Sequence, residues 1–318
     1  GERGRPLHRG APPAAMMSGV QRPGLAGADR QDTVPPSVPG GADPGHDPAP
    51  SGPSGASGPS GPSLRATLLR VGGLAVLLAG PLVVALVALA RPAWHPLSDV
   101  SLIEMRVRDV GGGHTPLIGV YGRFEGYGQT GSHPGPLLFY VLWPVYTLAG
   151  SDGLALQLAG VALALAASAV AVWLGWRRGG WPLALGVTAV LVLLTRGFGA
   201  ERIAEPWNPN VAAVWWVVFL LAVWSVLCDD LPVLPVAVFA GTLCVQSHVG
   251  YALLVAALGG AVVLWLAYGA LRHRAALGPR LVRWVALAVG VGVLLWLPPL
   301  IDQAVNDPGN LSVLVEGF

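Results

Sequence analysis

The sequence predicts an all-α membrane protein in which about seven helices cross the bilayer and shorter interfacial or re-entrant helices occupy the first outer loop. Hydrophobic residues make up 53% of the 318 residues, and the mean hydropathy is +0.59. Both values are too apolar for a soluble domain of this size. Apolar runs near the length that a bilayer requires also recur along the chain.

Residues 1–63 are rich in Pro, Gly, Ala and Ser and show neither helical nor strand periodicity, which is typical of a disordered tail. Arg65 and Arg70 flank the N-terminal side of the first apolar run. The positive-inside rule therefore predicts a cytoplasmic tail, followed by a transmembrane domain over residues 64–318.

Seven apolar runs are predicted to span the bilayer, and a shorter run, 136–149, starts from a Pro-rich corner. If that short run also spanned, Arg177 and Arg178 would face outward, as would the arginines between the last two spans, against the positive-inside rule. We therefore predict that it is interfacial or re-entrant. The predicted spans are residues 66–90, 154–175, 181–196, 211–227, 232–246, 249–271 and 284–300.

This topology leaves a first outer loop, 91–152, and a second, 197–210, on the extracytoplasmic face. Charged residues form only 11% of the chain, yet the first loop concentrates them. Ionisable residues crowded in a loop beside a membrane favour a functional site there.

Within the first loop, Ser98 and Asp99 precede a segment with helical apolar spacing, in which Glu104 and Arg108 are placed to pair at i, i+4. Asp99 is either a simple N-cap or a catalytic carboxylate. Further along, Tyr121 and Tyr127 accompany Arg123 in a Gly-rich stretch. These residues fit membrane anchoring, and they equally fit a sugar or isoprenoid-phosphate site.

The second outer loop carries Arg202, Glu205 and the step Trp207-Asn208-Pro209. Asn208 is either an N-cap before Pro209 or a polar group of a site. Gln246 and His248 lie near the outer end of another span, where polar residues usually face a cavity or one another. A lone histidine such as His133 or His248 is at least as often a structural residue as a functional one.

An Asp soon after the first helix, together with Ser132-His133-Pro134-Gly135-Pro136 leading into a short apolar helix, resembles the GT-C superfamily of glycosyltransferases. Its protein O-mannosyltransferase and aminoarabinose-transferase-like members show a His-Pro-Pro-Leu step at this place, and the stretch from Arg202 to Glu205 is similar to their second outer loop. The chain departs from the pattern in two ways: no acidic residue follows Asp99 directly, and Gly135 interrupts the step.

The resemblance implies a GT-C-like bundle that uses a polyprenyl-phosphate sugar donor and a glycan, lipid or protein acceptor on the extracytoplasmic face. It implies Asp99 as general base, with Glu104 the nearest second acid. A divalent cation is left open, no metal-type spacing is present, and membrane lipids but no nucleic acid are expected as partners. The expected phosphate-binding residues are Arg202, Arg123, His133 and His248, and the expected substrate-binding residues are Tyr121, Tyr127, Glu205, Trp207, Asn208 and Gln246.

Two other classes of function stay open. A transporter or flippase of lipid-linked saccharides would bind a saccharide in the same outer vestibule, although the halves of the chain show no convincing repeat. A non-catalytic subunit of a cell-envelope assembly fits the missing second acid beside Asp99. Relatives of the GT-C type continue with further helices, so the resemblance also implies sequence beyond Phe318.

Overall fold

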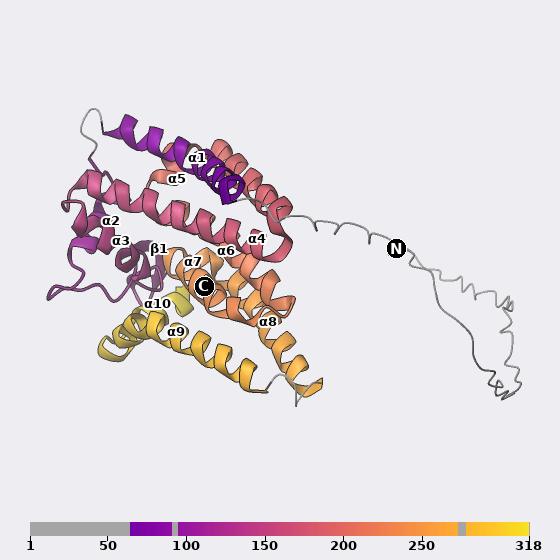
Figure 1. Ribbon diagram of the computed structural model, residues 1–318. Coiled ribbons are helices and arrows are strands. Elements are labelled where there is room, and N and C mark those ends of the chain that lie inside the picture. Colours follow the sequence, from indigo (N-terminus) through magenta and orange to yellow (C-terminus); the bar gives the residue numbers. More distant parts are fainter. Residues whose placement is uncertain (1–63, 91–94, 273–277, 318) are drawn as a thin grey trace, which may run out of the picture. The chain divides into compact units, whose positions relative to one another are not determined.

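The computed structural model describes residues 64–90, 95–272 and 278–317, and most of these are helical (Figure 1). The predicted disordered tail lies outside the described residues. Within the described part, five helices are long and apolar enough to cross a membrane. They are α1 (Leu64–Leu89), α4 (Gly153–Phe198), α6 (Asn208–Leu227), α8 (Ala252–Arg272) and α9 (Gly278–Val305).

Helix α4 contains a chain reversal. Its backbone leaves helical geometry at Gly179 and Gly180, where Gly180 adopts φ 61° and ψ −153°, a conformation open to glycine. A Cβ added at Gly175 would lie 2.9 Å from Cγ2 of Val187, whereas twelve residues of straight helix would separate the two by about 18 Å. The element therefore consists of two arms packed together, which correspond to the predicted spans 154–175 and 181–196.

The remaining elements are short. They are α2 (Asp99–Arg108), α3 (Leu137–Leu148), α5 (Ala200–Ala204), α7 (Leu234–Ser247), α10 (Asn310–Gly317), the 3-10 turns η1 (Leu231–Val233) and η2 (Val249–Tyr251), and the strands β1 (Tyr121–Gly126) and β2 (Gln129–Ser132).

The antiparallel pair β1–β2 departs from the predicted all-α class. Gly126 pairs with Gln129, so Tyr127 and Gly128 alone form the turn. Both have positive φ, 51° and 70°, which matches a type I′ turn, the two-residue connection that suits the twist of a hairpin. Helix α10 packs on both strands, so the hairpin is covered on one side.

The helices pack in a chain of contacts in which α1 contacts α4, α4 contacts α6, α6 contacts α7 and α7 contacts α9 (Figure 1). In the most apolar 18-residue stretch of α6, 61% of the stretch is buried inside the protein. The buried share of the corresponding stretch is only 17% in α1 and 6% in α8. The outer helices therefore present apolar side chains outward, as lipid-facing helices do.

Contacts divide the bundle into two ends. At one end, which we name the basic end, Arg177 after the first arm of α4 pairs with Asp230 after α6 at 2.6 Å, and Arg70 lies over the ring of Trp181. At the other, which we name the polar end, Asp99 bonds to Trp207 and Asn208 bonds to Ser247. The polar end comprises residues 95–152, 199–210, 246–251 and 302–317.

Helix α3 begins and finishes at the polar end. The backbone N–H of Leu137 at its start donates to Gln246, and Tyr146 near its finish bonds to Glu104 of α2. With twelve residues, it is shorter than the roughly 20 that a bilayer crossing needs. The contacts agree with a helix that does not cross, and its position relative to a bilayer stays a prediction.

Candidate functional site

Two histidines from distant segments meet at the polar end. His133 follows β2 directly, and its backbone extends the hairpin by hydrogen bonds with Val120 and Gly119. His248 lies between α7 and η2. Their ring centroids are 5.1 Å apart with 32° between the planes. The rings of Phe124 and His133 meet edge to face, with their centroids 5.9 Å apart. The structure therefore brings together two residues that sequence reasoning singled out separately.

Both imidazoles favour the neutral form. Burial above all, together with the charge of His248, lowers the pKa of His133 to about 4, and Asp99 opposes the shift. Burial also lowers the pKa of His248. The Nδ1 of His133 accepts from the backbone N–H of Val249 at 3.3 Å, and the Nδ1 of His248 accepts from Gly250 at 3.2 Å. This pattern places each proton on Nε2, where it can be donated to a ligand.

Asp99 adds a carboxylate to this end of the bundle. It is the first residue of α2 and is exposed, and its Oδ2 accepts from the indole Nε1 of Trp207 at 3.1 Å. Ser98 occupies the N-cap position, and no side-chain capping bond forms there. The capping interpretation of Asp99 is therefore wrong. We name Asp99, Trp207, His133 and His248 the histidine–carboxylate cluster.

Asn208 and Gln246 support the cluster through the backbone. Asn208 is not the N-cap of α6, because Trp207 holds that position. Its amide instead donates to the backbone O of Ser247 at 2.9 Å, beside His248. Gln246 is buried, accepts from the N–H of Leu137 at 3.1 Å and donates to the O of Leu295 at 2.8 Å. Its amide groups are thereby occupied within the protein.

Asn310 and Asp302 are two further residues of the site that are not among the candidates expected from the sequence. Asn310 is buried; its Oδ1 accepts from the N–H of Ser132 at 2.8 Å, and its Nδ2 donates to the O of Ser132 and of His133. Asp302, also buried, accepts from the N–H of Asn310 at 2.8 Å. The sequence did contain a signal, because Asp302 directly follows the apolar run that ends at Ile301. An acidic residue in such a place is expected to be buried and therefore to have a partner.

Glu104 belongs to a different set of contacts. It is buried, and its Oε1 accepts from Arg108 at 2.6 Å and from the hydroxyl of Tyr146 at 3.0 Å. The predicted i, i+4 pair is thus confirmed. Glu104 and Arg108 line a separate cavity of about 380 Å³ that also contains His95 and Asp152.

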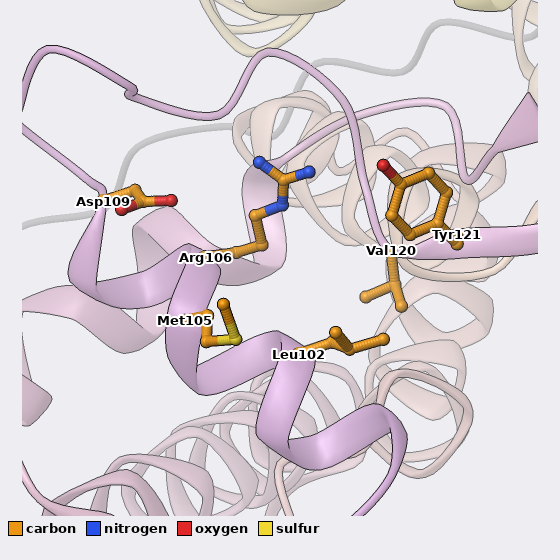
Figure 2. A pocket seen from close by; sticks show the side chains of 6 residues that line it. All are labelled: Leu102, Met105, Arg106, Asp109, Val120 and Tyr121. Atoms are coloured by element: carbon orange, nitrogen blue, oxygen red, sulfur yellow. The ribbon is translucent and has the colours of Figure 1, made fainter.

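The tyrosines of the hairpin also lie apart from the cluster. Tyr121 is exposed and lines a cavity of about 260 Å³; in Figure 2 the guanidinium of Arg106 lies between the carboxylate of Asp109 and the ring of Tyr121. Tyr127 is exposed at the turn, and its backbone N–H donates to the carboxylate of Glu316. Arg123 neighbours Phe124 on β1, where the strand pairing is irregular, and is exposed.

Arg202 and Glu205 line a further cavity, of about 170 Å³, together with Leu89, Gln157 and Glu201. Burial raises the pKa of Glu205, and Arg202 opposes the shift. Asp99, Trp207, His133 and His248 are not among the residues that line this cavity.

Within the described ranges, no group of three or more His, Cys, Asp or Glu residues could hold a metal ion. Comparisons of the chain with protein-family models, with curated proteins and with solved structures find no match. The histidine–carboxylate cluster offers one exposed carboxylate that can accept a proton and two neutral imidazoles that can donate hydrogen bonds.

Proposed function

We propose that the protein is a glycosyltransferase that moves a sugar from a polyprenyl-phosphate donor to a glycan, lipid or protein acceptor at the polar end. The observation that supports it best is the convergence of Asp99, Trp207, His133 and His248 from four separate segments. Carboxylate, indole and imidazole groups are the types that a sugar and a leaving phosphate require.

In this proposal Asp99 is the general base. Its Oδ2 is held by Trp207, and its Oδ1 has no hydrogen-bond partner among the described residues, so it is free to receive a proton. The acceptor hydroxyl gives its proton to Asp99 while its oxygen attacks the anomeric carbon, and the bond from that carbon to the phosphate oxygen breaks. A single displacement of this kind inverts the anomeric configuration.

The leaving phosphate gains negative charge as this bond breaks. The Nε2–H groups of His133 and His248 are suited to donate hydrogen bonds to it, because both imidazoles remain neutral donors at neutral pH. Arg202 and Arg123 stay candidates for binding the donor phosphate. Since neither contacts the cluster in the structure, their participation requires movement of the side chain or of the hairpin.

The proposed topology has seven crossings: α1, the two arms of α4, α6, the segment of η1 and α7, α8 and α9. The segment of η1 and α7, Leu231–Ser247, is shorter than the five long apolar helices, and it is counted because it joins the two ends of the bundle. Each of these elements links the basic end to the polar end, and Arg70, Arg177 and Arg178 belong to the basic end. The positive-inside rule then puts the basic end and the N-terminus in the cytoplasm and the histidine–carboxylate cluster on the extracytoplasmic face of the cell membrane.

The test is sugar transfer from a labelled polyprenyl-phosphate sugar in vesicles that contain the purified protein, with membrane extracts as the source of acceptor. Asp99→Asn should lower the transfer rate by about 10²- to 10⁴-fold, because general-base catalysis contributes that much. Asp109→Asn is the matched control, since Asp109 caps the other end of α2 and should leave the rate unchanged. Wild-type turnover in Asp99→Asn would remove Asp99 from the mechanism. Saccharide translocation without transfer by the wild type would favour a transporter instead.

A further inference from the structure

A small cavity at the polar end contains an unsatisfied buried amide. The cavity measures about 170 Å³ and lies between the end of α1, the start of α4 and the α5 segment. Gln157 lines it and is 0% exposed, yet neither its Oε1 nor its Nε2 has a hydrogen-bond partner. Buried side-chain amides are nearly always hydrogen-bonded, so this one indicates a partner that the protein itself does not supply.

The charged groups of the cavity have both signs. Arg202 is exposed and forms no ion pair with any residue that the structure describes. Glu201 and Glu205 add two carboxylates. A simple anion at Arg202 would face these carboxylates, and a simple cation would face the guanidinium. A ligand that carries one positive and one negative group satisfies both.

An apolar groove adjoins this cavity. It measures about 320 Å³ and shares Glu201 and Arg202 with the smaller cavity. Its other lining residues are apolar or glycine, and α1 and α5, which supply most of them, lie side by side (Figure 1). Only 17% of the most apolar stretch of α1 is buried, so the groove borders the lipid-facing side of the bundle. These other lining residues are Pro81, Val84, Ala85, Ala88, Phe198, Gly199 and Ala200.

We propose that the two cavities bind one phospholipid whose head group carries a phosphate and a primary ammonium. The phosphate accepts hydrogen bonds from Arg202 and from the Nε2–H of Gln157. The ammonium donates to Glu205 and to the Oε1 of Gln157, and an acyl chain lies in the groove. A cavity of this size suits a head group and not a whole ligand, because drug-sized ligands occupy about 300–1,000 Å³.

This site is distinct from the histidine–carboxylate cluster, and the inference does not depend on glycosyl transfer. A lipid held between α1 and α5 links the outermost described helix of this side to the rest of the bundle. Since a ligand that binds only the folded state stabilises it, the lipid should raise the temperature at which α1 separates from α4.

The experiment measures lipid binding to the purified full chain by native mass spectrometry and by lipid-dependent thermal unfolding in detergent. The probes are phosphatidylethanolamine, phosphatidylcholine, phosphatidylglycerol and a polyprenyl phosphate. Phosphatidylethanolamine should bind about 10-fold tighter than phosphatidylcholine, whose quaternary ammonium cannot donate hydrogen bonds. Equal affinity for the three phospholipids would overturn the proposal, as would tighter binding of the polyprenyl phosphate that Gln157→Leu weakens.

Three variants test the assigned contacts. Gln157→Leu and Arg202→Gln should each weaken phosphatidylethanolamine binding by roughly 10-fold or more. Glu205→Gln should weaken the binding of phosphatidylethanolamine but not that of phosphatidylglycerol, because only phosphatidylethanolamine carries the ammonium. Arg106→Gln is the matched control for Arg202, since Arg106 lines a different cavity. Arg202 is exposed, so its variant is expected to fold even if Gln157→Leu does not. Unchanged binding in Arg202→Gln, or in a folded Gln157→Leu, would show that the lipid does not use this site.

Discussion

Asn310 holds the backbone of His133 across 177 residues of sequence. Its Nδ2 donates to the O of His133 at 3.4 Å and to the O of Ser132 at 3.1 Å, while its Oδ1 accepts from the N–H of Ser132 at 2.8 Å. Asp302 in turn accepts from the N–H of Asn310. The position of one histidine of the cluster is therefore set by the C-terminal helix α10 and not by the hairpin alone.

Replacing Asn310 with Ala should destabilise the protein by about 1–3 kcal/mol, because the buried N–H and O of Ser132 lose their bonds to Asn310. The O of His133 loses Asn310 but keeps the N–H of Gly119. It should also loosen the hairpin, which hydrogen exchange of residues 129–133 would show as faster exchange. Asn306→Ala is the control, since Asn306 is exposed and bonds only to Asp302. Equal effects of the two substitutions would contradict a specific role for Asn310.

The histidine pair should make stability depend on pH. In the folded state burial lowers the pKa of His133 to about 4, whereas an unfolded histidine titrates near 6.5. Folding therefore favours the neutral form of His133. The protein keeps its full stability with respect to this residue above about pH 6.5 and loses stability as the pH falls toward 4. The loss from His133 should approach roughly 3 kcal/mol, and His248 adds to it in the same direction.

Thermal unfolding in detergent between pH 7 and pH 4 measures this dependence. His133→Asn should flatten the profile, because Asn cannot titrate and its side-chain oxygen can still accept from Val249. His114→Asn serves as the control, since His114 is exposed in a loop. A His133→Asn profile that runs parallel to the wild-type profile would show that the pH dependence arises elsewhere.

The sequence was sufficient to predict α2 and most of its apolar face. Apolar spacing predicts Val100, Ile103, Val107 and Val110 on one face; the first three are buried, whereas Val110 lies beyond the helix and is half-buried. Glu104, expected on the polar side, is buried as well. The pairing of Glu104 with Arg108 also follows from local spacing alone. Such features depend on neighbours three or four residues away, so a single sequence contains the information that they need.

Features that depend on distant residues were not predictable. The β-hairpin is formed by a Gly-rich stretch without a clear alternation, and it is covered by α10 from the far end of the chain. The hydrogen bond from Asn310 to the O of His133 likewise joins residues that are 177 positions apart in the sequence. Likewise, the sequence grouped Arg202 with Asp99, whereas in the structure Arg202 and Gln157 line a cavity that Asp99 does not line. Loop residues can reach several partners, and only tertiary packing selects one of them.

Gln246 should act as a structural residue and not as a substrate ligand. Gln246→Leu keeps a similar volume but leaves the N–H of Leu137 and the O of Leu295 unpaired, so stability should fall by about 2–6 kcal/mol. Gln303→Leu is the matched control: its bonds to Ser312 are only partly buried, so water can replace them. Chemical or thermal unfolding gives both values. A stable Gln246→Leu protein that binds substrate poorly would instead assign Gln246 to the site.

Glu104 and Tyr146 test whether the second acid of the first outer loop is structural or catalytic. The hydroxyl of Tyr146 contacts Arg108 at 2.7 Å, Glu104 at 3.0 Å and the O of Ser151 at 2.9 Å, so it joins α2 to the end of α3. Tyr146→Phe should lower stability by about 1–3 kcal/mol, more than Tyr140→Phe, whose hydroxyl has one partner, the O of Pro116.

Glu104→Gln should lower the stability of the protein about as much as Tyr146→Phe does. It should keep the wild-type rate of sugar transfer per folded molecule, because Glu104 is already bonded to Arg108 and Tyr146. Unfolding curves and the vesicle transfer assay, run on the same preparations, separate the two effects. A Glu104→Gln protein of wild-type stability that lost transfer to the extent expected for Asp99→Asn would place Glu104 in the chemistry. It would also mean that the pair with Arg108 opens when substrate binds.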